Sequence, residues 1–274
     1  VLTRVTKENA LFCFCLTEPD AGSDAASIRT KALLEGDHYL LNGRKCFITN
    51  GGISDFYTIF AVTNREKKME GITGFVVEKG TPGLSVGKTE EKMGIRGSNT
   101  TEVVLENVRV PITQRIGEEG VGWWLMMRTL NRSRPAIGAL AIGLAQGALD
   151  YIIRFSQERG WAESKNDTLG VQFMLADMAI EVEAARALVY KAAKMMDEKA
   201  KGTPVQMYSA MSKYFASDVA MKATTNAVQI MQWHGLVQDH PIERMMRDAK
   251  VIQIFEGTNQ IQRMVVAHTL LKSK

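Results

Sequence analysis

The chain has 274 residues, of which 45% are hydrophobic and 23% are charged, and its formal net charge is +4 at pH 7. This length and composition are typical of a globular protein with one or two domains and a large buried core. The small and dispersed positive charge gives no argument for nucleic-acid binding.

The sequence shows no run of 18 apolar residues and no signal peptide, so we expect no membrane span and no secretion. It begins at Val1 rather than Met, which leaves open a targeting segment upstream. Cys13, Cys15 and Cys46 lie in strand-like apolar sequence without the partners that a metal site needs. We therefore expect buried free thiols, no metal, and a reducing compartment, either the bacterial cytoplasm or the mitochondrial matrix.

The first part of the chain alternates short β-rich runs with turn residues such as Asn42-Gly43 and Glu35-Gly36-Asp37, which are typical hairpin connections. This spacing predicts an antiparallel β-barrel or sandwich domain over residues 1–112. The predicted strands are residues 11–16, 30–34, 39–41, 46–49, 56–62, 74–78 and 101–110.

After Pro111, apolar residues recur at three- and four-residue spacing, which is typical of helices. The predicted helices are residues 122–129, 136–158, 172–199, 205–233, 241–254 and 257–271. We expect them to form a C-terminal four-helix-bundle-like domain over residues 113–274, which gives an α+β fold.

Three segments are typical of a ligand site. Residues 254–263, Ile-Phe-Glu-Gly-Thr-Asn-Gln-Ile-Gln-Arg, place Glu256 before a glycine and a polar run. Residues 16–24, Leu-Thr-Glu-Pro-Asp-Ala-Gly-Ser-Asp, gather small and hydroxyl residues in one loop, and residues 47–52, Phe-Ile-Thr-Asn-Gly-Gly, repeat that chemistry at a strand end. In this order the segments resemble the acyl-CoA dehydrogenases, flavoenzymes that form a trans double bond next to a thioester. Members of this family carry a further N-terminal helical domain, which we expect to be absent here.

The resemblance implies a catalytic base at Glu256, which matches the glutamate of the family's Tyr-Glu-Gly-Thr motif, with Phe255 in place of tyrosine. In other branches the base lies on an earlier helix, at the position of Ser133, where serine cannot serve. The ordinary alternative for Glu256 is a cap or ion pair at a helix that begins near Gly257. Removal of the α-proton requires a base, and a flavin must accept the β-hydride because side chains cannot.

The resemblance also implies FAD as cofactor and acyl-CoA as substrate. Leu16 and Thr17 match contacts to the flavin ring, Phe47 lies against it, and Thr49 reaches its N5 atom. An ordinary turn is the alternative for residues 16–24, and core packing is the alternative for Phe47. The implied cofactor-binding residues are Leu16, Thr17, Gly22, Ser23, Phe47, Thr49, Gln229, Thr258 and Gln260. The implied substrate-binding residues are Ser23, Arg134 and Gly257.

Two segments depart from the family pattern. Arg159 stands where an Arg-x-x-Phe-Gly loop reaches the FAD pyrophosphate across a dimer interface, but residues 159–164 lack Phe-Gly and are one residue short. Gln232 and Trp233 replace two glycines of a turn that lets backbone approach the cofactor. We therefore expect weaker FAD binding on the adenosine side than is usual in the family. His234 is more consistent with a surface turn than with catalysis.

The resemblance implies α,β-dehydrogenation of a short- or medium-chain acyl-CoA to the trans-2-enoyl-CoA. The resemblance implies a homodimer or homotetramer that passes electrons to an electron-transfer flavoprotein. The alternatives are an oxidase or reductase variant of the fold, and a non-catalytic assembly or binding subunit that has lost FAD.

Overall fold

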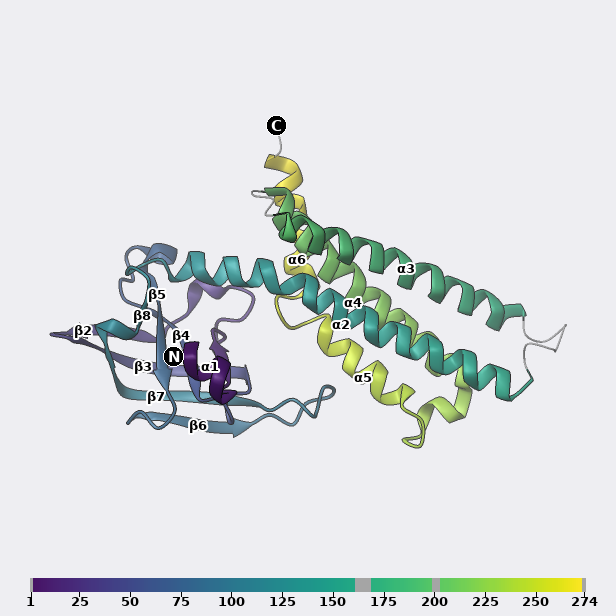
Figure 1. Ribbon diagram of the computed structural model, residues 1–274, viewed down its shortest axis with the longest axis horizontal. Coiled ribbons are helices and arrows are strands. Elements are labelled where there is room, and N and C mark those ends of the chain that lie inside the picture. Colours follow the sequence, from purple (N-terminus) through teal and green to yellow (C-terminus); the bar gives the residue numbers. More distant parts are fainter. Residues whose placement is uncertain (1, 161–168, 199–202, 273–274) are drawn as a thin grey trace. The chain divides into compact units, whose positions relative to one another are not determined.

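The computed structural model describes residues 2–160, 169–198 and 203–272 (Figure 1). The chain divides into two compact units. The first comprises Val1–Lys92 and Arg96–Arg128, and the second comprises Met93–Ile95 and Thr129–Lys274. The predicted α+β fold class is confirmed.

The first unit is built on an 8-stranded sheet with strand order β6-β7-β3-β2-β4-β5-β8, and β1 pairs with β4. The pairs are antiparallel except β1–β4 and a short β2–β4 contact, which are parallel. The strand path has two ends, so the sheet is not closed into a barrel. The elements are α1 (Leu2–Glu8), β1 (Phe12–Cys15), β2 (Lys31–Glu35), β3 (His38–Thr49), β4 (Phe56–Val62), β5 (Ile72–Glu78), β6 (Leu84–Thr89), β7 (Thr100–Pro111) and β8 (Arg115–Ile116).

Strand β3 joins the two short strands predicted at residues 39–41 and 46–49. Its pairing with β7 shifts register between Leu41 and Gly43 and again between Lys45 and Ile48. Such bulges change which side chains face the core. The three cysteines are buried and free, as predicted, and the sulfur atoms of Cys13 and Cys15 are 3.6 Å apart.

The second unit is helical. Helix α4 packs against α3, α5 and α6 (Figure 1). Buried alanines recur through this core, and their small side chains allow the helices to approach closely: Ala141, Ala145, Ala148, Ala185, Ala216, Ala220, Ala223 and Ala227. The helices are α2 (Gly122–Glu158), α3 (Leu169–Asp197), α4 (Thr203–Met231), α5 (Ile242–Ile252) and α6 (Asn259–Lys272), and a 3₁₀ turn, η4, covers Gln232–Leu236.

Helix α2 is continuous through Pro135, so the predicted break between residues 129 and 136 is wrong. Proline has no N–H and leaves the carbonyl four residues earlier without its helical donor. That carbonyl, on Asn131, accepts a hydrogen bond of 2.6 Å from the Ser209 hydroxyl of α4. A side chain from a neighbouring helix therefore replaces the missing donor and keeps residues 131–134 helical.

By length and composition alone, α2 is the one helix among the described residues that is apolar enough to cross a membrane. This is weak evidence, because core helices of soluble proteins pass the same test. Ala141, Ala145, Leu149 and Ile152 of α2 lie in the helical core, which accounts for its hydropathy.

Candidate active site

Glu256 lies in the short loop between α5 and α6, three residues before α6 begins at Asn259. Its φ angle is 57° and that of Gly257 is 88°, so two successive residues adopt the left-handed region. This conformation is uncommon for a residue with a side chain and is costly unless its surroundings stabilise it. Such strain is typical of functional turns.

Capping of α6 does not require Glu256. The hydroxyl of Thr258 accepts a hydrogen bond of 3.3 Å from the amide of Ile261, which is the contact of an N-cap residue. The structure thus gives the capping role to Thr258, and the glutamate is left for other contacts.

The carboxylate of Glu256 faces α2. Its Oε2 accepts a hydrogen bond of 2.8 Å from the Ser133 hydroxyl. Next to Ser133, the guanidinium of Arg134 is buried, with 4% of the residue exposed, and its Nε has no hydrogen-bond partner among the described residues. Burial lowers the pKa of Arg134, and the charge of Glu256 opposes that shift. A buried donor without a partner is a candidate contact for a bound acceptor.

A buried polar network supports this loop. The carbonyl of Gly257 accepts hydrogen bonds of 2.9 Å from both Lys213 Nζ and Gln262 Nε2. A side chain at position 257 would be strained, because φ is 88° there and a Cβ would lie 2.7 Å from that Gln262 nitrogen, which would have to move. Lys213 is completely buried, and this burial, together with the nearby charge of Arg134, lowers its pKa to about 8. Lys213 could not be recognised from the sequence, because its burial depends on contacts from two other elements.

In the β unit, the loop that contains Leu16 and Thr17 is held by a buried ion pair. Lys45 Nζ on β3 donates to the carbonyl of Leu16 at 3.1 Å and to Glu18 Oε1 at 2.7 Å. Glu18 also accepts hydrogen bonds from Thr30. Burial acts to raise the pKa of Glu18, but Lys45 and these hydrogen bonds outweigh it and lower that pKa. The loop therefore has a fixed backbone.

The bulge in β3 allows Lys45 and Cys46 to be buried while Phe47 and Thr49 remain outside. Phe47 is 63% exposed and has a φ of 54°, so core packing does not explain it. The hydroxyls of Thr17 and Thr49 make no hydrogen bond to any described residue. An exposed aromatic ring with free hydroxyls nearby on the same unit suits a flat, polar ligand.

The other predicted cofactor residues of this unit, Gly22 and Ser23, are exposed. A Cβ at Gly22 would meet nothing within 4 Å, so local packing does not require glycine there. In the helical unit, Gln229 on α4 and Gln260 in the first turn of α6 are also exposed.

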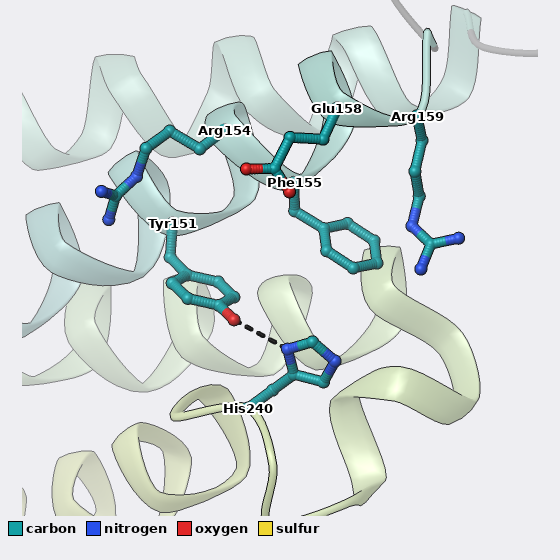
Figure 2. A pocket seen from close by; sticks show the side chains of 6 residues that line it. All are labelled: Tyr151, Arg154, Phe155, Glu158, Arg159 and His240. Carbon is teal, nitrogen blue, oxygen red and sulfur yellow. Dashed lines mark hydrogen bonds between the residues drawn. The ribbon is translucent and has the colours of Figure 1, made fainter.

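The C-terminal end of α2 borders a separate hollow of about 550 Å³, lined by Tyr151, Arg154, Phe155, Glu158, Arg159 and His240 (Figure 2). The Tyr151 hydroxyl lies 2.7 Å from His240 Nδ1. Arg159 stacks over the Phe155 ring at 4.3 Å, and its guanidinium is 2.8 Å from His234 Nε2. Burial and the charge of Arg159 lower the pKa of His234. Residues 161–164 of the altered segment after Arg159 lie outside the described residues.

The altered glycine turn forms η4. Gln232 keeps a left-handed φ of 54°, and Trp233 is 64% exposed and stacks on His234 with ring centroids 3.5 Å apart. The remaining glycine, Gly235, is required by packing, because a Cβ there would lie 2.7 Å from the carbonyl of Val228.

Comparison with known proteins identifies this arrangement. The model of the acyl-CoA dehydrogenase middle domain matches residues 13–108, and that of the acyl-CoA dehydrogenase C-terminal domain matches residues 120–271.

Two relatives are similar over nearly the whole chain. The probable acyl-CoA dehydrogenase FadE25 of Mycobacterium tuberculosis is 51% identical over 274 residues, which is 99% of this chain and 70% of the relative. The short-chain-specific acyl-CoA dehydrogenase of Clostridium acetobutylicum is 44% identical over 272 residues, which is 99% of this chain and 71% of the relative.

The solved structure of butyryl-CoA dehydrogenase from Megasphaera elsdenii shares 43% identity with a TM-score of 0.94, over 99% of this chain and 70% of that one. The chain therefore belongs to the acyl-CoA dehydrogenase family of flavin-dependent oxidoreductases.

Proposed function

We propose that the protein is an FAD-dependent dehydrogenase of short- or medium-chain acyl-CoA thioesters, and that Glu256 is its catalytic base. The observation that carries the proposal is the left-handed turn at Glu256 and Gly257, which directs the carboxylate at Ser133 while Thr258 caps α6. The similarity to a butyryl-CoA dehydrogenase supports the short end of the acyl range.

The β unit offers surfaces that suit the flavin ring of FAD. Phe47 presents an exposed ring, and Thr17 and Thr49 present hydroxyls without a hydrogen bond to the residues that the structure describes. The buried Lys45–Glu18 pair holds the loop that contains Leu16. On the adenosine side, Gln229, Thr258 and Gln260 are the residues that would contact the cofactor. When bound, FAD supplies the acceptor for the substrate's β-hydride.

The chain's own residues supply the proton chemistry and the binding contacts. Glu256 removes the α-proton, and the hydrogen bond from Ser133 orients its carboxylate. Arg134 has a buried Nε without a partner among the described residues, which is available to the coenzyme A chain. We include in the proposal an electron-transfer flavoprotein as electron acceptor, assembly as a homodimer or homotetramer, and a location in the bacterial cytoplasm or the mitochondrial matrix.

The test is Glu256→Gln in the full gene product. Glutamine keeps the shape of the side chain but cannot take a proton, so the rate of flavin bleaching by acyl-CoA should fall by about 10²–10⁴-fold while flavin content and acyl-CoA binding persist. Glu106→Gln, at an exposed carboxylate on β7, is the control and should bleach at the parental rate. Unchanged bleaching of Glu256→Gln in stopped-flow measurements with several acyl lengths would remove the assignment.

A second candidate, a binding subunit without FAD, is favoured by one observation. Gln232 and Trp233 place side chains where the family has glycines. The colour of the purified protein separates the candidates: the dehydrogenase is yellow and bleaches with acyl-CoA, whereas the binding subunit is colourless and cannot be reconstituted.

A further inference from the structure

The loop that carries Glu256 is anchored at both ends to one carboxylate on α4. Asp218 Oδ1 accepts hydrogen bonds of 2.7 Å from Gln253 Nε2, before the loop, and from Asn259 Nδ2, after it. The backbone N–H of Asn259 also donates to the backbone carbonyl of Gln253 at 3.0 Å, and this contact closes the loop. These contacts fix where the loop begins and ends, but they do not fix the peptide that follows Glu256 and Gly257.

That peptide is held by Lys213, five residues before Asp218 on the same helix. Its Nζ donates to the carbonyl of Gly257 and to Asn259 Oδ1, both at 2.9 Å. Glycine has no Cβ and is conformationally permissive, so the backbone at residue 257 allows more than one orientation of its carbonyl. The charged Nζ of Lys213, by donating to the Gly257 carbonyl, favours the backbone orientation in which the Glu256 carboxylate reaches Ser133.

The cost of placing a lysine here argues for more than packing. Lys213 is completely buried. Taking an ammonium group out of water is expensive, and a well-packed apolar side chain often serves stability as well or better. Gln262 already donates to the same carbonyl. The Gly257 carbonyl would therefore still accept a hydrogen bond if Lys213 were absent. Lys213 adds a second donor, and this one is charged.

We propose that Lys213 is a positioning residue for Glu256: by holding the Gly257 carbonyl it selects the left-handed turn that aims the carboxylate of the base. This inference rests on the proposed function of Glu256. Lys213 itself contacts no reactant, so its effect belongs to the chemical step rather than to acyl-CoA binding.

The test compares Lys213→Met with Lys222→Met in the full gene product. Lys222 lies on the same helix but is exposed and pairs with Glu181. Misplacement of a catalytic group by about 1 Å costs up to about 10²-fold in rate. We expect Lys213→Met to lower the maximal rate of flavin reduction by about 10- to 10²-fold, with KM and flavin content within about threefold of the parent. Lys222→Met should match the parent.

If Lys213→Met does not fold, Lys213→Gln tests the same position with a shorter, neutral donor, and the same loss in maximal rate without a change in KM is expected. The proposal is overturned by a variant that folds and keeps the parental rate. It is also overturned by a variant whose KM changes as much as its maximal rate. In the Glu256→Gln background, Lys213→Met should have no further effect on the residual rate, and an additional loss there also overturns it. Failure of the base assignment is distinguishable, because Glu256→Gln alone would then bleach at the parental rate.

Discussion

The hydroxyl of Ser133 donates a hydrogen bond to the carboxylate of Glu256, with 2.8 Å between Oγ and Oε2. The family resemblance gives these two positions as alternative locations of the base, one on α2 and the other on the loop before α6. The contact means that side chains from both elements reach the same point. A base at either position therefore acts on the same region of a bound substrate.

The first prediction follows from that contact. In the Glu256→Gln background, Ser133→Glu should recover part of the lost flavin reduction, at least about tenfold above Glu256→Gln alone, because general base catalysis supplies about 10²–10⁴-fold. Ser133→Gln in the same background is the matched control, since it has the same size without a base, and it should recover nothing. Stopped-flow reduction by a short acyl-CoA measures the effect. Equal rates for the glutamate and glutamine variants, both with bound flavin, would contradict it.

The sequence predicted the fold class and most elements, and the misses have physical causes. The helix predicted to break before residue 136 is continuous because Ser209, on another helix, supplies the donor that Pro135 lacks. Strand β6 was missed because its alternation of apolar and polar residues stops after Val86, and five of its six residues are exposed. Both features depend on partners that are distant in sequence.

The candidate site divides in the same way. The motif residues Glu256, Gly257 and Thr258 were recognisable because their order is distinctive. Lys213 and Lys45 were not, because a buried lysine looks like any surface lysine until its partners are known. The segment around Gln232 was only partly predictable. The sequence shows that Gln232 replaces a glycine, but it does not show that the residue keeps a left-handed backbone.

The second prediction concerns that segment. Gln232 has a φ of 54°, and a left-handed residue with a side chain costs about 1–2 kcal/mol. Gln232→Gly should therefore raise the free energy of unfolding by about 1 kcal/mol, after allowance for the greater flexibility of glycine in the unfolded chain. Combined with Trp233→Gly, it should also increase flavin retention through gel filtration. Urea unfolding measures the first effect, with Gln238→Gly, outside the left-handed region, as a control that should not stabilise. Unchanged or lower flavin retention in the double variant would contradict the idea that the side chains of Gln232 and Trp233 keep the backbone away from the cofactor.

The third prediction concerns the buried pair under the loop of Leu16 and Thr17. Lys45→Met leaves the Glu18 carboxylate buried without its cation, which should cost about 3–5 kcal/mol at pH 7. Lys45→Met/Glu18→Gln should recover part of that loss. The pKa of Glu18 is lowered in the folded state, so its stabilising contribution is present above the unfolded value of about 4.3 and is lost as pH falls through the folded value. Urea unfolding at pH 7 and in the acid range measures both effects. A Lys45→Met protein as stable as the parent at pH 7 would show that the pair contributes little.

The last prediction is a pH dependence of stability that arises from Lys213. Its pKa is about 8 in the folded protein, mainly because of burial, against about 10.4 in an unfolded chain. Between these values the unfolded chain binds a proton that the folded chain does not, so the free energy of unfolding rises with pH, by at most about 1.4 kcal/mol per unit. Below pH 8 both states are protonated and the cost of burying the charge is fully present. A neutral amine still has N–H groups for Gly257 and Asn259, so the loop contacts survive the proton loss.

The measurement is the difference in unfolding free energy between the parent and Lys213→Met from pH 7 to pH 10. This difference cancels the contributions of titratable groups that the two proteins share. This difference should shift in favour of the parent by about 2.5 kcal/mol across the window, whereas the same comparison with Lys222→Met, whose lysine has a raised pKa, should show no such rise. A constant difference for Lys213→Met would mean that the buried lysine keeps an ordinary pKa.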